Sequence, residues 1–413
     1  MQTQSATIDG VRLLARVEEM ARIGATPAGG VTRLTLTDED RRARDLFDAW
    51  CGAAGLTVRI DDMGTQYARY EGGDPALPPV LVGSHLDSVP LGGRYDGPLG
   101  VLTALEVVTA LRERGIRPRR AIEVVNFTNE EGVRFEPAMV ASAVLAGKYT
   151  PAFVHSLRDR AGRTYGEELD RIGYRGAVEN RPGAVHAYLE LHIEQGPVLE
   201  AAGLPIAAVE GIVGIRWCEI VLRGQPQHAG PSPMGTRRDA MVAAARIVVA
   251  ARDLARSYPD PVVATVGRLT PSPGVINQIP AEVVLSLDVR HWTAEGLAEI
   301  SDRAQEMARK IAAEEGVEIA IATVQDIPPT HFDRRIVDLF AAEAHARGVP
   351  HRRMVASAGH DAAYMNLICP TAMLFVRTVG GRSHCETEAI AGEDAIVAAE
   401  ILCGAVLRLA EEV

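Results

Sequence analysis

Histidine and carboxylate residues recur along this chain in short polar segments, several of which follow apolar runs. Imidazole and carboxylate are the side chains that bind divalent metal ions such as Zn²⁺. Two ions held side by side need at least one shared ligand, and the two oxygens of one aspartate can serve one ion each. The candidate ligands are His85 and Asp96 in GSHLDSVPLGGRYDG, Glu131 in NFTNEEG, His192 in ELHIEQGPVLE and His384 in GGRSHCETE. Together they predict a two-metal hydrolytic site with Asp96 as the shared ligand.

Glu130 stands next to the ligand Glu131 and remains available to act on water. We expect it to take a proton from the attacking water and to pass it to the leaving nitrogen. Metal activation of water at such a site favours attack on a carbonyl carbon. Asp87, two residues after His85, is expected to accept the second N–H of that imidazole and so to fix its orientation.

Each of these residues also has an ordinary structural interpretation. Taken alone, His85 is more often a hydrogen-bonded core histidine. Asp96 can cap the helix that is expected after Pro98. The pair Glu130-Glu131 can be a solvated turn. The combination of residues, and no single one of them, favours the metal site.

Six motifs in one order carry a resemblance that runs from about residue 10 to the C-terminus. They are GSHLDSVPLGGRYDGPLGV, NEEGVRF, HIEQGPVLE, QHAGPSPMGTRRDA, NQIPAEVVLSLDVR and AGHDA. The chain resembles the M20 family of metallohydrolases, in the hydantoinase/carbamoylase branch of N-carbamoyl-L-amino-acid hydrolases and allantoate amidohydrolases. The resemblance implies an α/β catalytic domain with a mixed sheet and an inserted ferredoxin-like (βαββαβ) domain for dimerisation and closure. It also implies two divalent ions per subunit, Zn²⁺ first, with Mn²⁺, Co²⁺ or Ni²⁺ as alternatives, and a homodimer formed through the inserted domain.

The resemblance assigns further residues to the substrate. Gln195 carries an amide that suits a ureido group, with a plain surface role as an equal alternative. Arg290 is expected to bind a substrate carboxylate through its planar guanidinium, with a salt bridge to Asp288 as the structural alternative. His228 is expected to stabilise the oxyanion, supplied by the partner subunit of a dimer. The other implied substrate contacts are Asn277, Gly359 and His360.

One ligand position separates the branches of the family. Peptidase members have an acid where this chain has His192, whereas the branch that acts on carbamoyl groups has histidine in HIEQGP. We therefore expect cleavage of the C–N bond of an N-carbamoyl-L-amino acid to the L-amino acid, ammonia and carbon dioxide. The alternatives within the branch are allantoate amidohydrolase and β-ureidopropionase. An N-acyl amino-acid hydrolase or dipeptidase, or a metal-bound binding protein without turnover, fits these residues less well.

The segment around His384 departs from the family pattern. Where relatives continue from Phe-Val-Pro to Gly-x-Ser-His-x-Pro-Glu, this chain reads FVR at 375–377 and GRSHCETE at 381–388. The ligand is kept, but Arg377 and Arg382 add two cations that the pattern does not include. Because of these two cations, the family pattern does not identify the side chain of the substrate.

Size and composition fit a soluble enzyme. A chain of 413 residues exceeds what one hydrophobic core usually covers, so two domains are expected. The net charge of −11 argues against a nucleic-acid partner, because phosphates attract basic surfaces. There is no apolar run of the roughly 20 residues that would span a bilayer, and residues 1–10 lack the features of a secretory signal. Five cysteines without metal-type spacing favour free thiols in a cytoplasmic protein.

Apolar runs that resemble buried strands alternate with helical segments in the first half of the chain, which predicts an α/β sheet. The candidate ligands fall mostly at the ends of these strands, where ligands of such sheets gather. The leucines of Tyr188–Ile193 alternate with His192, which places them on opposite faces of a strand. The predicted elements of this half are strands at Pro79–Gly83, Ala121–Phe127 and Tyr188–Ile193 and a helix at Val101–Arg114.

Between Gly211 and Pro328 the pattern changes to the β-α-β-β-α-β order of a ferredoxin-like fold. The predicted elements there are strands at Trp217–Arg223, Pro261–Leu269, Val283–Arg290 and Val317–Val324 and helices at Arg237–Ser257 and Ala294–Glu315. The first domain then resumes with a helix at Asp333–Gly348, a strand at Thr371–Val376 and a helix at Ala389–Leu409. We therefore assign 1–211 and 329–413 to the catalytic domain and 212–328 to the inserted domain.

Overall fold

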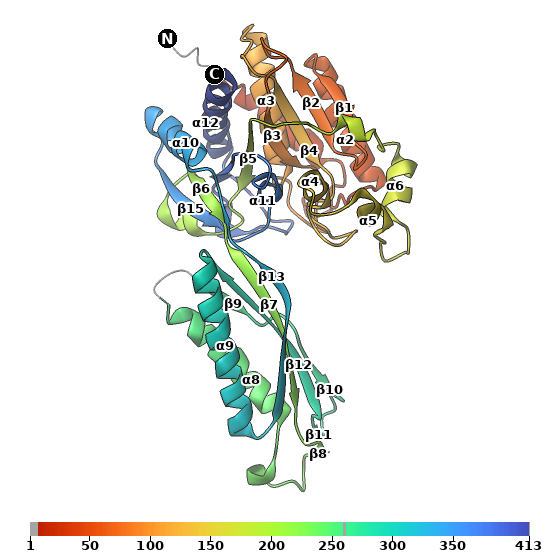
Figure 1. The fold of residues 1–413 in the computed structure, drawn as a ribbon, viewed down its shortest axis with the longest axis vertical. Coiled ribbons are helices and arrows are strands. Elements are labelled where there is room, and N and C mark those ends of the chain that lie inside the picture. Colours follow the sequence, from red (N-terminus) through yellow and green to blue (C-terminus); the bar gives the residue numbers. More distant parts are fainter. Residues whose placement is uncertain (1–6, 259–261, 413) are drawn as a thin grey trace. The chain divides into compact units, whose positions relative to one another are not determined.

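The computed structural model describes residues 7–258 and 262–412 (Figure 1). Contacts within the chain define two compact units, each with its own sheet. Unit 1 comprises Met1–Gly211 and Phe332–Val413, and unit 2 comprises Ile212–His331. Among the described residues, every helix is too short or too polar to cross a membrane.

Unit 1 is built on a mixed sheet. The strands of this sheet are, in spatial order, β1 (Thr57–Ile60), β2 (Gln66–Tyr70), β4 (Ile122–Phe127), β3 (Val80–His85), β5 (Ala187–Ile193), β16 (Thr371–Val376), β6 (Ile206–Ile212) and β14 (Thr330–His331), with β15 (His351–Ala356) paired to β6. The central strands β4, β3, β5 and β16 run parallel, while β2 and β6 run antiparallel to their neighbours. All four central strands are buried along their whole length, as parallel strands covered on both faces should be.

Two long helices, α3 (Pro98–Glu113) and α12 (Gly392–Glu411), pack on the central strands and on each other. Helix α3 begins with a proline in its first turn and is buried from Pro98 to Leu111, so its uniformly apolar sequence suits a core position. The other helices of unit 1 are α1 (Gly10–Ala21), α2 (Asp38–Ala53), α4 (Val140–Leu145), α5 (Pro151–Ser156), α6 (Tyr165–Ile172), α7 (Val198–Ala202), α10 (Arg334–Ala346) and α11 (Asp361–Met365).

Unit 2 is an antiparallel sheet with two helices on one face. In spatial order its strands are β10 (Leu269–Ser272), β12 (Glu282–His291), β7 (Gly214–Arg223) and β13 (Glu318–Ile327), with β9 (Val263–Thr265) also paired to β12. Residues of β12 alternate between buried and half-buried, and the buried set packs against α8 (Ala240–Arg256) and α9 (Ala294–Glu315). This confirms the predicted ferredoxin-like order. A small pair, β8 (Gln227–His228) and β11 (Gln278–Ile279), completes the unit.

One predicted strand of unit 2 is wrong as a single element. The segment predicted as Pro261–Leu269 contains the short strand β9 and, at Leu269, only the first residue of β10. Both strands pair with β12, and Pro261 itself lies outside the described residues. Gly267 falls in the interruption between them, and glycine weakens the interior of a strand.

Candidate metal centre

Asp96 lies between two groups of potential ligands. Its Oδ1 is 3.7 Å from Nε2 of His85 and 3.1 Å from Nε2 of His192. Its Oδ2 is 3.2 Å from Nε2 of His384, which is also 3.5 Å from Oε2 of Glu131. Two sets of ligand atoms therefore share one carboxylate, namely His85–Asp96–His192 and Asp96–Glu131–His384.

The parallel strands of unit 1 bring these residues together. His85 is the last residue of β3, and His192 stands one residue before the end of β5. Glu130 and Glu131 follow β4, and His384 lies in the loop after β16. The carboxyl ends of parallel strands meet at one edge of a sheet, so residues far apart in sequence converge there.

Gly97 makes room for this arrangement. Its φ of +82° is unfavourable for other residues, and a Cβ at this position would lie 2.4 Å from a carbon of the His85 ring. Gly97 is also the N-cap of α3, with no side-chain hydrogen bond to the helix. The structural alternative for Asp96, a helix cap, is therefore not what the fold uses.

The donor set fits two divalent ions. Each set combines imidazole and carboxylate, and each has ligand atoms within 4.8 Å of one another, a span that one ion can fill. Oε1 of Glu131 is buried and has no hydrogen-bond partner among the described residues. A buried carboxylate oxygen without a partner is costly unless a cation satisfies it.

Asp87 supports the site differently from the prediction. Nδ1 of His85 is 2.9 Å from the backbone oxygen of Asp87, whereas the Asp87 carboxylate is 3.9 Å from that nitrogen. The carboxylate instead accepts hydrogen bonds from the backbone N–H groups of Glu130 and Glu131, both at 3.3 Å. The peptide carbonyl already satisfies the imidazole, so the side chain is free to hold the loop that carries the acids.

Replacing Asp87 with asparagine is expected to weaken metal binding or turnover by roughly 10–100-fold, the usual cost of losing a group that orients ligands. The amide keeps the shape of the carboxylate but turns one acceptor into a donor, which then faces a backbone N–H. Metal content after dialysis and kcat/KM on the same sample measure the effect. Unchanged values for both would show that the contact to Glu130 and Glu131 is dispensable.

Burial and mutual charge shift the titration of the cluster. Burial lowers the pKa of His85 to about 4. Burial also opposes the charged form of His192, but the neighbouring Asp96 carboxylate outweighs it and raises the pKa of His192 to about 9. Burial, followed by the charge of Glu131, raises the pKa of Glu130 well above its ordinary range. The metal-free cluster therefore holds protons that cations would displace.

Two predicted substrate residues of unit 1 lie beside the ligands. Nε2 of Gln195 donates to Oδ2 of Asp96 at 2.8 Å, while its Oε1 is buried without a partner in the described part of the chain. His360 is 1 % exposed, its ring lies 4.4 Å from that of His192, and neither of its nitrogens has a described hydrogen-bond partner. Beside it, a Cβ on Gly359 would lie 3.0 Å from the terminal methyl carbon of Met139, a contact that a small shift of this flexible side chain can relieve.

The three predicted substrate residues of unit 2 do not lie together. His228 in β8 and the neighbouring Asn277 are exposed at one end of the unit. Arg290 lies near the other end of β12, eight residues beyond Glu282, which is roughly 26 Å at about 3.3 Å per residue. There Nη2 of Arg290 is 2.8 Å from Oδ2 of Asp288, the salt bridge considered as the structural alternative. Within unit 2, one small substrate therefore cannot contact both His228 and Arg290.

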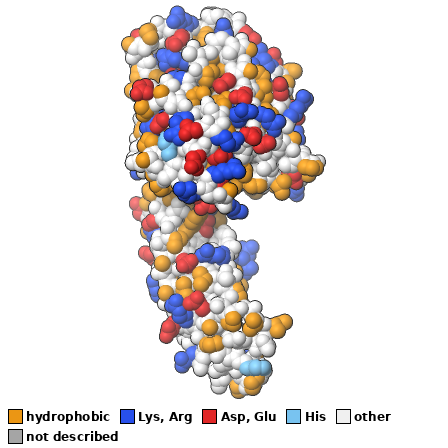
Figure 2. All heavy atoms as spheres, turned by 90° about the vertical axis from the view of Figure 1, so that its right-hand side faces the viewer, with side chains coloured by type: hydrophobic (Ala, Val, Ile, Leu, Met, Phe, Trp, Pro, Cys, Tyr) orange, Lys and Arg blue, Asp and Glu red, His pale blue; other side chains and the backbone are white. Residues whose placement is uncertain are grey.

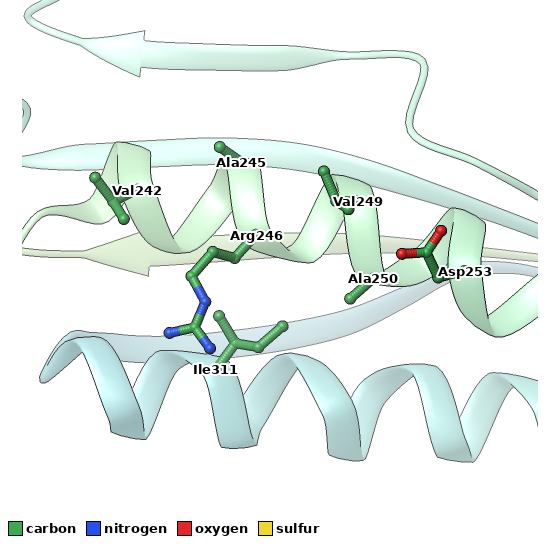
Figure 3. Close-up of a pocket in the computed structure, with 7 residues that line it drawn as sticks. All are labelled: Val242, Ala245, Arg246, Val249, Ala250, Asp253 and Ile311. Carbon is green, nitrogen blue, oxygen red and sulfur yellow. The ribbon is translucent and has the colours of Figure 1, made fainter.

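A hollow between α8 and α9 of unit 2 offers little chemistry (Figure 3). Its only basic residue, Arg246, forms ion pairs with Glu314 and Glu315. The residues that line it are Val242, Ala245, Arg246, Val249, Ala250, Asp253 and Ile311. None of these is a histidine or cysteine, so this hollow offers no metal-binding or nucleophilic side chain.

The two unexpected arginines near His384 have different surroundings. Arg377 forms an ion pair with Asp394 of α12, with Nη2 and Oδ2 2.8 Å apart. Arg382 is exposed, two residues before His384. Sequence reasoning missed two groups in this segment, Ser383 and Glu388, which contact Asp96. The signal that was present is an acid four residues after the ligand histidine.

The parallel strands of this mixed α/β sheet carry two ligand sets that share one carboxylate, with a further acid beside them. This arrangement defines a hydrolase suited to two metal ions. The model of peptidase family M20/M25/M40 matches residues 81–408. The chain belongs to this family, and within it to the hydantoinase/carbamoylase branch.

Relatives and solved structures support this assignment over nearly the whole chain. An N-carbamoyl-L-amino-acid amidohydrolase of Rhizobium meliloti is 40% identical over 408 residues, covering 99% of this chain and 98% of the relative. The allantoate amidohydrolase of Escherichia coli K12 is 33% identical and covers 88% of this chain and 89% of its own. The crystal structure of a hydantoinase/carbamoylase family amidase from Burkholderia multivorans has a TM-score of 0.95 and 44% identity, covering 98% of this chain and 99% of that one.

Proposed function

We propose that the protein hydrolyses the C–N bond of N-carbamoyl-L-amino acids, releasing the L-amino acid, ammonia and carbon dioxide. The observation that carries this proposal is the position of Gln195. Its amide N–H is used by Asp96, whereas its buried Oε1 has no described partner and can accept an N–H from a ureido group. A buried acceptor that pairs with a ureido NH₂ favours ureido substrates over substrates that offer no donor at this place. The carbamoyl-hydrolysing relatives support the same substrate class.

The residues of the chain divide the reaction between them. His85, Asp96 and His192 would hold one ion and Asp96, Glu131 and His384 the other. When bound, these ions polarise the ureido carbonyl and make water a stronger nucleophile at neutral pH. Oε2 of Glu130 is 3.7 Å from Nε2 of His85, so the carboxylate can reach a water at the ligand set, take its proton and deliver it to the leaving nitrogen.

We further propose that the substrate carboxylate is bound by Arg290 and that His228 and Asn277 act on the site of a partner subunit in a homodimer. The separation within unit 2 supports this division, because His228 and Arg290 lie too far apart to share one small substrate. The end of unit 2 that carries β8 and β11 also exposes apolar side chains, including Met234 and Ile276, as expected of a surface that meets another chain (Figure 2).

Assays of ammonia release by the metal-loaded protein test the proposed reaction. The panel comprises N-carbamoyl-L-amino acids with different side chains, the D-enantiomers, allantoate, 3-ureidopropionate and N-acetyl-L-amino acids. We expect the highest kcat/KM with an N-carbamoyl-L-amino acid. A preference for allantoate or 3-ureidopropionate assigns one of the alternatives of the branch. Turnover of N-acetyl substrates without turnover of ureido compounds would contradict the role given to Gln195.

A mixing experiment is expected to show that His228 acts in trans. A homodimer of His228→Ala lacks His228 in both of its active sites, and a homodimer of Glu130→Gln lacks Glu130 in both. In a mixed dimer, one site receives Glu130 from one chain and His228 from the other. Co-expression should therefore restore about a quarter of wild-type activity, since about half of the dimers are mixed and each has one complete site. Activity no higher than the mean of the two homodimers would place His228 in its own subunit or outside the site.

A further inference from the structure

Glu388 connects two ligand-bearing loops that come from opposite ends of the sequence. Its Oε1 accepts hydrogen bonds from the backbone N–H groups of Tyr95 and Asp96, at 3.0 and 3.1 Å. Its Oε2 is 2.9 Å from Oγ of Ser383, which is also 2.8 Å from Oδ2 of Asp96. Glu388 is 292 residues from Asp96 along the chain and only four from His384.

The surroundings of Glu388 fit a fixed carboxylate. Its residue is 4 % exposed, so its bonds do not compete with bulk water. A Cβ on Gly93 would lie 1.9 Å from the carboxyl carbon of Glu388, so glycine at this position lets the loop close over the carboxylate. The hydroxyl of Ser383 has a single hydrogen and can donate to only one of the two carboxylates at a time. When Asp96 gives its oxygens to ions, that hydrogen remains available to Glu388.

We propose that Glu388 is the positioning residue of the bridging ligand: it holds the backbone at Asp96 against the His384 loop so that the two carboxylate oxygens reach separate ligand sets. This inference rests on the proposed two-metal site. The geometry repeats what Asp87 does for the acids, since in both cases a buried carboxylate accepts two consecutive backbone N–H groups next to a ligand. The role depends on reach and acceptor geometry and does not require Glu388 to bind metal.

Two substitutions separate geometry from charge. Glu388→Gln removes the negative charge but keeps an oxygen at the same distance for both N–H groups. Glu388→Asp keeps the charge but is one methylene shorter, so its oxygens withdraw from Tyr95 and Asp96. Glu386→Gln is the matched control, because Glu386 lies on the same segment but accepts a hydrogen bond from Thr26, away from the ligands.

Competition with a chelator for Zn²⁺ measures the affinity of each site, and the visible spectrum of the Co²⁺-loaded protein reports its coordination. We expect Glu388→Asp to lose roughly 10–100-fold in affinity at one or both sites, with a changed Co²⁺ spectrum. Glu388→Gln should stay within a few-fold of the wild type, and Glu386→Gln should match it. The metal-free variants should melt at nearly the same temperature as the metal-free wild type, even where their metal affinities differ.

Three other outcomes would contradict these expectations. If the Asp variant binds metal as the wild type does and the Gln variant does not, charge and not positioning explains Glu388. If both variants lower the stability of the metal-free protein and leave affinity intact, the role is structural and the inference fails. A wild type that binds fewer than two ions at every metal concentration would instead overturn the proposed two-metal site.

Discussion

Replacing Glu130 with glutamine is expected to lower kcat by roughly 10²–10⁴-fold, the share of a general base. The amide is nearly isosteric with the carboxylate but cannot take a proton from water at neutral pH. The backbone N–H of Glu130, which Asp87 accepts, is unaffected by the change. Metal content should therefore stay at two ions per chain, and KM should change much less than kcat.

Metal analysis and steady-state kinetics on the same preparation decide the role of Glu130. Asp361, another buried carboxylate of unit 1, offers a comparison, because its Oδ1 accepts from Ser142 at 2.5 Å and it belongs to neither ligand set. Asp361→Asn should keep much more activity than Glu130→Gln. A metal-replete Glu130→Gln protein with near-normal kcat would remove Glu130 from the mechanism.

The sequence could predict that these histidines and carboxylates lie together, because their side-chain types and their places after apolar strands both carry information. Imidazole and carboxylate restrict the chemistry, and parallel strands bring their carboxyl ends to one edge. The βαββαβ order of unit 2 could also be predicted, because its long helices and strands have distinct periodicities. The break between β9 and β10 was not predictable, because both strands are short and their pairing is set by β12.

The supporting contacts could not be predicted, because their partners are backbone groups. Asp87 and Glu388 accept N–H groups that every residue except proline carries, so no residue type marks the partner. The prediction that the Asp87 carboxylate binds the His85 ring was chemically reasonable. The ring is instead hydrogen-bonded to the backbone carbonyl of the same residue, Asp87. The ion pair of Arg377 could not be predicted either, because its partner Asp394 lies in a different element.

Removal of the metal ions is expected to destabilise the protein in a pH-dependent way. An ion that is present at 100 to 1,000 times its dissociation constant stabilises the folded state by about 2.7–4.1 kcal/mol. In the metal-free site, burial and then the charge of Glu131 raise the pKa of Glu130 above its ordinary value of 4.5. A carboxyl group with a raised pKa binds more protons in the folded state than in the unfolded state. Its contribution to stability is therefore full below pH 4.5 and is lost as the pH rises through the folded pKa.

Metal binding should follow the opposite trend, because it displaces those protons. The Asp96 carboxylate raises the pKa of His192 to about 9, so at neutral pH His192 carries a proton and forms an ion pair with Asp96. It must lose this proton before it can bind a metal ion. Each proton released makes the apparent affinity rise about tenfold per pH unit, so the stabilisation by metal should grow between pH 5 and 8 by the ordinary linkage rule.

Calorimetric titration of Zn²⁺ in buffers of different ionisation enthalpy counts the protons that leave on binding. We expect net release in the wild type at neutral pH and a smaller release in Glu130→Gln, which lacks one of the protonated carboxyl groups but none of the ligands. The same two proteins therefore connect the kinetic role of Glu130 to its titration. Equal proton release by both would show that the protonation of Glu130 does not change when metal binds. Metal affinity that does not change with pH would contradict the whole electrostatic account of the cluster.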